Sequence, residues 1–159
     1  MTPQQISEKL KSQFSDNILD VKIDGVLDPF VKIAASHIKE VAIFLREDAD
    51  LQFDYLMCLS GVDYGKNVLG VVYHLASMQH RHKITVKVEI PADNPEVPSV
   101  SSIWPTANWH EREAYDMIGI KFIGHPDLRR MLLPEDWDGH PLRKDYKVPE
   151  FYQGMKVPY

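Results

Sequence analysis

The sequence has 159 residues, of which 44% are hydrophobic and 26% charged, and its formal net charge is −5. This length fits one domain that buries about 70% of its unfolded surface, and the acidic balance gives no electrostatic reason to expect nucleic acid as a partner. Cys58 is the single cysteine, which excludes an internal disulfide, a CxxC zinc site and an all-cysteine iron–sulfur cluster held by this chain alone.

Membrane signals are weak throughout the sequence. The longest strongly apolar run, VAIFL at 41–45, is far shorter than the roughly 20 residues with which a helix spans a bilayer. The opening stretch MTPQQISEKLKSQF lacks the apolar segment of a signal peptide. We therefore expect a cytoplasmic protein, which a membrane complex could still hold.

The first predicted elements are a helix and a strand. Thr2, Pro3 and Gln5 have the spacing of an N-cap, a first-turn proline and a capping-box partner, which predicts a helix over 3–14. The alternating stretch ILDVKI at 18–23 then predicts a strand.

The next segment combines turn and helix signals. The DG pair at 24–25 indicates a tight turn, after which a second short strand is possible at 26–27. Asp28 and Pro29 repeat the pattern of a cap followed by proline. An apolar stripe at helical spacing then predicts a second helix, and its members are Phe30, Ile33, Ala34, Ile38, Val41 and Leu45.

The middle of the chain predicts a hairpin. Residues 51–65 are ambiguous, because their first half suits a helical turn and their second half a strand, so we divide them near Cys58. Two long alternating stretches, 69–76 and 84–90, predict the two strands of a hairpin.

The last predicted helix covers 107–118, with Pro105 near its start and Gly119 where a left-handed C-terminal residue is favoured. Beyond it the apolar spacing is irregular, and five prolines exclude a long helix: Pro126, Pro134, Pro141, Pro149 and Pro158. We therefore predict an α/β fold of the α+β type. It has a two-layer domain over 1–122, with one mixed sheet of about four to five strands packed by helices, and an extended proline-rich tail over 123–159.

The stretch WHEREAYDMIGIKF at 109–122 concentrates the candidate chemistry. A zinc protease would need HExxH, but position 114 is alanine, so the second histidine is missing. Helical projection places Glu111 within the apolar stripe, where a carboxylate needs a partner, and tail arginines are the candidates. On the opposite arc, Arg112 and Asp116 have i,i+4 spacing.

That opposite arc also carries Trp109 and Glu113. A charged face that holds an indole favours a protein interface, although a plain solvated face stays open as the alternative. Residues 124–147 contain five basic and five acidic side chains. Such balance favours ion-paired docking to protein over binding to nucleic acid. The histidines of the two GHP repeats are interpreted as turn or surface residues.

The segment 111–146, EREAYDMIGIKFIGHPDLRRMLLPEDWDGHPLRKDY, resembles the signature region of the hydrophilic 30 kDa subunit family of respiratory complex I (NADH:quinone oxidoreductase). Upstream stretches such as VDYG, VVYHL and PSVSSIWPTANWHERE extend the resemblance to roughly 50–150. The matching positions of the signature are Glu111, Arg112, Glu113, Asp116, Gly119, His125, Pro126, Leu128, Arg129, Pro134, Trp137, Pro141, Leu142, Arg143, Lys144 and Asp145.

The resemblance implies a non-catalytic, cofactor-free hydrophilic subunit of a proton-translocating oxidoreductase, inactive as an isolated chain. It would scaffold the quinone-reducing module in the peripheral arm, beside the large quinone-site subunit and the iron–sulfur subunits, and those partners would carry flavin, clusters and quinone. The residues expected to bind partners or belong to the motif are Trp109, Glu111, Arg112, Glu113, Asp116, His125, Arg129, Arg130, Trp137, Arg143, Lys144 and Asp145.

Two alternatives stay open. Related subunits occur in membrane-bound hydrogenases and in ferredoxin-linked enzymes similar to complex I, so the electron donor and the type of quinone are not determined by this chain. A second alternative is a metal-dependent enzyme that uses His110, Glu113 and Asp116 with a histidine of the tail.

Overall fold

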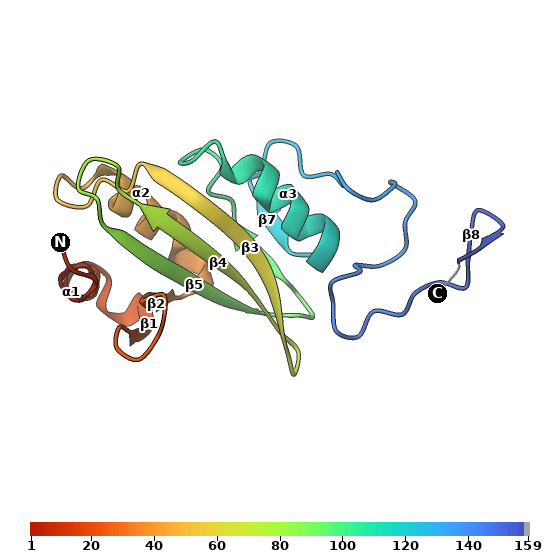
Figure 1. Cartoon of the computed structure of the whole chain (residues 1–159), viewed down its shortest axis with the longest axis horizontal. Helices are drawn as coiled ribbons and strands as arrows, with labels where there is room; N and C mark the ends of the chain where they lie inside the picture. Colours follow the sequence, from red (N-terminus) through yellow and green to blue (C-terminus); the bar gives the residue numbers. More distant parts are fainter. Residues whose placement is uncertain (158–159) are drawn as a thin grey trace.

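The computed structural model describes residues 1–157, so Pro158 and Tyr159 of the predicted tail lie outside the described residues. The chain forms a sheet packed by helices, from which a long tail extends at the end opposite the N-terminal helix (Figure 1). The helices and strands are α1 (Pro3–Phe14), β1 (Ile18–Lys22), β2 (Phe30–Ile33), α2 (Ile38–Glu47), β3 (Tyr55–Gly65), β4 (Val68–Ala76), β5 (Lys83–Pro91), β6 (Glu96–Pro98), α3 (Ala107–Ile118), β7 (Lys121–Ile123), β8 (Phe151–Tyr152) and β9 (Met155–Lys156).

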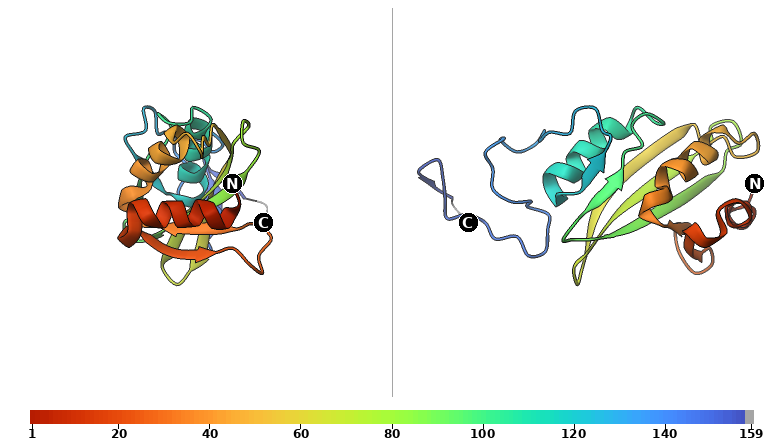
Figure 2. Two further views of the ribbon diagram at one scale, coloured as in Figure 1. Left: turned by 90° about the vertical axis from the view of Figure 1, so that its left-hand side faces the viewer. Right: turned by 180° about the vertical axis from the view of Figure 1, so that it is seen from behind.

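The main sheet is mixed, as the sequence predicts. Its five strands lie in the order β1-β2-β5-β4-β3, in which β2 and β5 are parallel and the other neighbours antiparallel. The β4–β5 hairpin pairs Val71 with Val88 and Tyr73 with Val86, and these apolar side chains are buried. Alternation along the two strands therefore directs one face toward the helices and the apolar core. Figure 2 shows α1 and α2 together at the end of the sheet that carries the N-terminus.

The first and last helices confirm the capping signals of the sequence. At the start of α1, the Thr2 side chain accepts a hydrogen bond from the Gln5 backbone N–H, and the Gln5 side chain accepts one from the Thr2 N–H. Ile6 and Leu10 of this helix are fully buried. At the end of α3, Gly119 adopts the left-handed conformation with φ +82°, which most other residues disfavour.

Two predictions in the first half are wrong. Residues 26–27 form part of the turn between β1 and β2 instead of a strand, and the helix predicted from Phe30 begins only at Ile38. Residues 30–33 form β2, whose register places Val31 beside Val86 of β5. The apolar residues at 31 and 33 are buried in alternation. Pairing with a buried central strand therefore overrides the local cap-and-proline signal.

The division of 51–65 near Cys58 is also wrong, because β3 continues from Tyr55 to Gly65. A bulge lies between Leu56 and Cys58, and a second one between Asp63 and Gly65. Each extra residue reverses the alternation of the two faces, which explains why the sequence of this strand lacks a uniform period of two.

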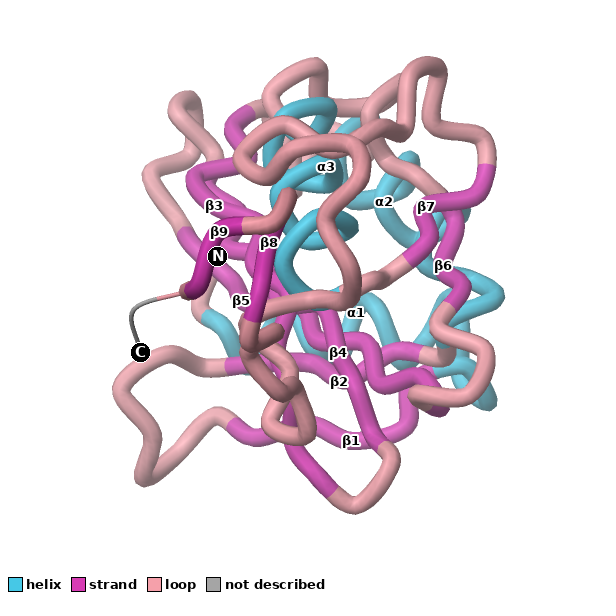
Figure 3. The backbone as a smooth tube through the Cα atoms, turned by 90° about the vertical axis from the view of Figure 1, so that its right-hand side faces the viewer, coloured by secondary structure: helices cyan, strands magenta, loops and turns pink. Residues whose placement is uncertain are grey.

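The segment predicted as an extended tail is mostly irregular. After β7, which pairs in parallel with β6, the described part of the tail forms turns and the short hairpin β8–β9. Figure 3, viewed from the side of the tail, shows its loops passing around α3. The tail is therefore placed by contacts with α3 more than by elements of its own.

Candidate functional site

Helix α3 packs closely on β3 because Gly61 has no side chain. A Cβ atom at Gly61 would lie 3.1 Å from Cβ of Ala114 and 3.2 Å from Cγ1 of Ile118. Ala114 and Ile118 are both buried. This contact fixes the position of α3 on the sheet, and therefore also the directions in which its polar side chains point.

Glu111 is fully buried and holds the segment that precedes the helix. Its Oε1 accepts a hydrogen bond from the Val100 N–H at 2.8 Å, and its Oε2 accepts one from the Ser99 hydroxyl at 2.6 Å. Burial raises the pKa of Glu111 to about 7, although these two hydrogen bonds oppose that rise. The expected partnership with tail arginines is wrong, because the loop at 99–101 comes closer to this face than the tail does.

Tyr73 of β4 lies in the core near this carboxyl. Its hydroxyl is buried and has no hydrogen-bond partner within the described residues. The pKa of Tyr73 is raised by burial and then by the negative charge of Glu111. Both groups are therefore buried where the charged form is disfavoured.

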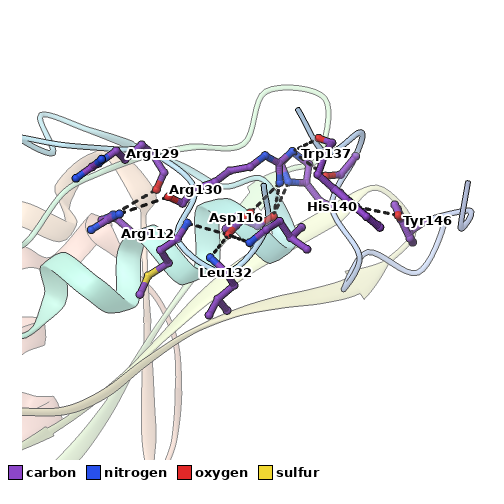
Figure 4. A network of polar contacts seen from close by, with 11 residues as sticks. Arg112, Asp116, Arg129, Arg130, Leu132, Trp137, His140 and Tyr146 are labelled. Atoms are coloured by element: carbon purple, nitrogen blue, oxygen red, sulfur yellow. Dashed lines mark hydrogen bonds and ion pairs between the residues drawn. The ribbon is translucent and has the colours of Figure 1, made fainter. Parts of the chain in front are cut away.

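Asp116 is fully buried and holds the tail. One oxygen, Oδ2, accepts hydrogen bonds from three successive backbone N–H groups, those of Met131 at 3.0 Å, Leu132 at 2.7 Å and Leu133 at 3.0 Å (Figure 4). The other oxygen accepts one from Arg130 at 2.8 Å. Burial alone would raise the pKa of Asp116, but the hydrogen bonds from Leu133, Arg130, Leu132 and Met131 outweigh it and lower the pKa. The carboxylate therefore stays ionised.

Arg130 connects distant parts of the tail to the helix. One guanidinium nitrogen contacts both Oδ1 and the backbone carbonyl of Asp116, and the other donates to the carbonyls of Trp137 and Gly139, each at 2.9 Å. The side chain of Arg130 is only 14% exposed. Arginine serves several acceptors at once better than lysine would, because its planar guanidinium carries several N–H donors in fixed directions.

The tail also caps the C-terminal end of α3. The last carbonyls of a helix have no partner within the helix. Here the Asp116 carbonyl contacts His140 Nδ1 at 2.9 Å, the Met117 carbonyl accepts from the Leu142 N–H at 3.0 Å, and the Ile118 carbonyl accepts from Arg143 Nε at 2.6 Å. The positive charge of Arg143 also complements the helix dipole at this end.

Gly119 provides the space for this cap. A Cβ atom at Gly119 would lie 2.5 Å from the His140 ring and 2.9 Å from the Arg143 guanidinium. Both the left-handed conformation and the close approach of the tail therefore require glycine here.

The histidines of the two GHP repeats have similar roles. His125 Nε2 contacts the carbonyl of Asn108 at 3.0 Å, near the start of α3, while His140 contacts the carbonyl of Asp116 near its end. Both rings are partly buried, so the interpretation as plain turn or surface residues is incomplete. The short sequence repeat corresponds to two attachment points on one helix.

The expected interface arc of α3 is divided by the structure. Trp109 is 68% exposed and Glu113 is exposed, as an interface face requires, but Asp116 is buried beneath the tail. Arg112 does not pair with Asp116 in the described part of the chain; its guanidinium donates instead to the carbonyls of Arg129 and Arg130, at 3.3 and 3.4 Å.

The remaining predicted residues of the tail differ in their roles. Arg129 makes an exposed ion pair with Asp127. Trp137 donates its indole N–H to the Tyr146 hydroxyl at 3.1 Å (Figure 4). Lys144 is attached through its backbone N–H, which donates to Asp63 of β3 at 2.7 Å. The exposed side chain of Asp145 lines shallow surface hollows and has no hydrogen bond within the described residues.

Sequence reasoning missed two polar residues of the site. Ser99 binds Glu111, and Asp63 accepts hydrogen bonds from Lys144 and Gly65, which lower the pKa of Asp63. Asp63 belongs to the VDYG stretch and Ser99 to the stretch PSVSSIW, both of which carry the family resemblance. Signals for both were therefore present, but the sequence offered no way to pair them with their partners.

The tail exposes large apolar side chains, although residues 130–144 are attached to α3 and β3 by hydrogen bonds. Beyond β7, five of them are between 52% and 65% exposed: Leu132, Leu142, Val148, Phe151 and Met155. Several large apolar side chains exposed along one segment suit an interaction surface. We call these five residues and Trp109 the docking surface.

The metal-enzyme alternative finds no support in the geometry. Within residues 1–157, no group of three or more His, Cys, Asp or Glu side chains is placed to hold a metal ion. His110 and Glu113 line a groove between α3 and β3, whereas the Asp116 carboxylate is occupied by Arg130 and the tail. Within the same residues, no helix is both long and apolar enough to cross a bilayer.

Known proteins resemble this chain in sequence over most of its length. The family model described as "Respiratory-chain NADH dehydrogenase, 30 Kd subunit" matches residues 31–152. The chain belongs to this family. A curated relative from Chlorobium phaeobacteroides, named as a subunit of NADH-quinone oxidoreductase, is 47% identical over 152 residues that cover 94% of this chain and 92% of the relative. One from Chloroherpeton thalassium with the same name is 54% identical over 151 residues, which cover 94% of this chain but only 63% of the relative's length.

Two solved structures share the fold of this chain. A structure described as a trypsin-resistant fragment (1-134) of Nqo5 superposes with a TM-score of 0.67 at 27% identity and covers 78% of this chain and 99% of its own. A chain of an archaeal membrane-bound sulfane sulfur reductase reaches a TM-score of 0.75 over 91% of this chain and 85% of its own. At 23% identity, the second likeness concerns the fold alone.

Proposed function

We propose that this chain is a docking and scaffolding subunit of a proton-translocating NADH:quinone oxidoreductase, and that it carries no redox group and no catalytic residue of its own. One observation carries the proposal: the tail is fixed to α3 by a buried polar network, while its large apolar side chains face outward. A segment that is held without burying its own apolar residues is built to bury them on another protein.

The chemistry of the buried groups supports a structural role. Asp116, Arg130 and Arg143 are all engaged with the backbone of this same chain. Glu111 is engaged with the loop that precedes α3. Groups whose hydrogen bonds are satisfied internally have little capacity left for a substrate.

The relatives named as subunits of NADH-quinone oxidoreductase indicate the kind of assembly. We propose that the docking surface lies on the large quinone-site subunit, next to the iron–sulfur subunits, in the peripheral arm on the cytoplasmic side of the membrane. Flavin, clusters and quinone would then reside in those partners. The apolar residues of the docking surface supply affinity at such an interface, and exposed charged side chains of the same helix and tail, such as Glu113, Arg129 and Asp145, supply orientation.

Affinity purification from native membranes tests the proposal. A tagged full-length chain should recover iron–sulfur and quinone-site subunits together with NADH oxidation activity. A variant with both Leu132 and Leu142 replaced by aspartate is purified in parallel. It should recover less of these subunits, although its core is unchanged because both side chains are about 60% exposed. If the tagged chain recovers no other subunit, the proposal is overturned. If it recovers a nickel-bearing subunit, the chain belongs to a membrane-bound hydrogenase instead.

A further inference from the structure

We infer that Asp116 and Arg130 form a latch, a buried ion pair that fixes residues 130–139 in their docking conformation before any partner binds. The role of the latch rests on the proposed function, because positioning matters only if this segment docks. The latch itself, however, is a property of the free chain, and it can be measured without a partner.

The geometry of the carboxylate supports a latch. Three successive N–H groups, those of residues 131–133, converge on one oxygen of Asp116. Successive backbone N–H groups of this kind form a concave anion-binding nest. Because the Asp116 side chain is 0% exposed, water does not compete for these bonds and a partner cannot reach the carboxylate. Asp116 therefore acts on docking only through the loop.

Arg130 links Asp116 to a later part of the tail. Its guanidinium joins Asp116 to the carbonyls of Trp137 and Gly139, so both ends of the loop at 130–139 meet at one side chain. Leu132 lies between these attachment points and is 60% exposed. Hydrogen bonds and an ion pair, not an apolar core, therefore hold the loop, and the side chain of Leu132 stays available to a partner.

The expected benefit is preorganisation. A loop that is already ordered does not lose that freedom on binding, and the apparent affinity rises with the fraction of molecules in the competent conformation. Loss of the latch should therefore slow association, while the contacts of the bound state, and hence dissociation, stay the same.

Hydrogen exchange on the purified full-length chain tests the latch directly. In the wild type, the amides of residues 131–133 should exchange slowly. In Asp116→Asn the same amides should exchange at least about tenfold faster, because charge-assisted hydrogen bonds are roughly twice as strong as neutral ones. Arg130→Lys keeps the positive charge but loses the forked guanidinium, so its amides at residues 131–133 should exchange at a rate between those of the wild type and of Asp116→Asn.

The matched control is Asp127→Asn, which removes an exposed carboxylate that pairs with Arg129 just before this loop. It should leave the three amides protected, and the amides of α3 and β4 should stay protected in all variants. Exchange of the wild-type amides at the rate of an unstructured peptide would overturn the latch. So would an equal effect of Asp127→Asn and Asp116→Asn.

Binding kinetics test the link to docking. The probe is solubilised membrane protein from cells that lack this chain, passed over immobilised variants. Asp116→Asn should associate about tenfold more slowly with an unchanged dissociation rate, as selection of a less populated conformation requires. Faster dissociation with unchanged association would overturn the positioning role. If the wild type binds nothing, the proposed function fails, and the exchange measurement alone decides the latch.

Discussion

Replacing Glu111 by glutamine should change how stability depends on pH. Burial raises the pKa of this carboxyl from 4.5 to about 7. The folded protein therefore retains a proton between these two values, where the unfolded chain has already lost it. Stability from this group is complete below pH 4.5, declines as the pH rises, and is lost above about pH 7.

The magnitude follows from the size of the shift. Each pKa unit corresponds to 1.36 kcal/mol, so the wild type should lose about 3 kcal/mol of unfolding free energy through Glu111 between pH 4.5 and pH 8. Glutamine cannot ionise but keeps the shape, with an oxygen for the Val100 N–H and an amide group for the Ser99 hydroxyl. Glu111→Gln should therefore be the more stable protein at pH 8.

Urea denaturation of both proteins at several values between pH 4.5 and pH 8 measures the effect. Burial lowers the pKa of His82 and His140, so these two groups impose the opposite trend on each protein. The difference between variant and wild type cancels that trend. Glu113→Gln, which alters an exposed carboxylate on the same helix, is the control and should show no such dependence. A difference between Glu111→Gln and wild type that does not vary with pH would refute the reasoning.

Other expectations concern the end of α3, the first cap and the docking surface. Gly119→Ala should destabilise the protein by about 1–3 kcal/mol in thermal denaturation and more than Gly124→Ala, because both glycines have positive φ but only Gly119 is crowded by the tail; equal losses would show that crowding is irrelevant. Thr2→Ala should lose about 1 kcal/mol with its cap, which circular dichroism during urea unfolding would detect, and no loss would mean that the capping box is dispensable. Trp109→Ala should change stability by less than about 0.5 kcal/mol yet lower the amount of assembled complex on native gels, and unchanged assembly would remove this residue from the docking surface.

The regular elements were accessible from the sequence where local signals and tertiary contacts agree. The capping box of Thr2 and Gln5 predicted α1, and alternation predicted the β4–β5 hairpin. The signals failed at Phe30, where parallel pairing with β5 overrides an apparent helix start, and in β3, where bulges interrupt the alternation. Both failures arise from partners that are distant in the sequence.

For the polar side chains of α3, the sequence could predict burial only in part, and it could not predict their partners. Helical projection correctly placed Glu111 in the buried stripe, but it could not show that Ser99, and not a tail arginine, lies opposite. The same projection placed Asp116 on an outer face, because it treats the helix as isolated and omits the tail that covers this face. An irregular tail has no period, so its path could be learned only from the structure.

The most direct test of the account compares assembly with turnover in native membranes. The quantity is NADH:quinone reductase activity divided by the amount of assembled complex, measured for the wild type, Asp116→Asn, Glu111→Ala and the double variant of Arg129 and Arg130 to alanine. A scaffolding subunit predicts that activity and assembly fall together, so the ratio stays constant across all four. A variant with normal assembly and lost turnover would contradict the account, because it would give this chain a direct part in the chemistry.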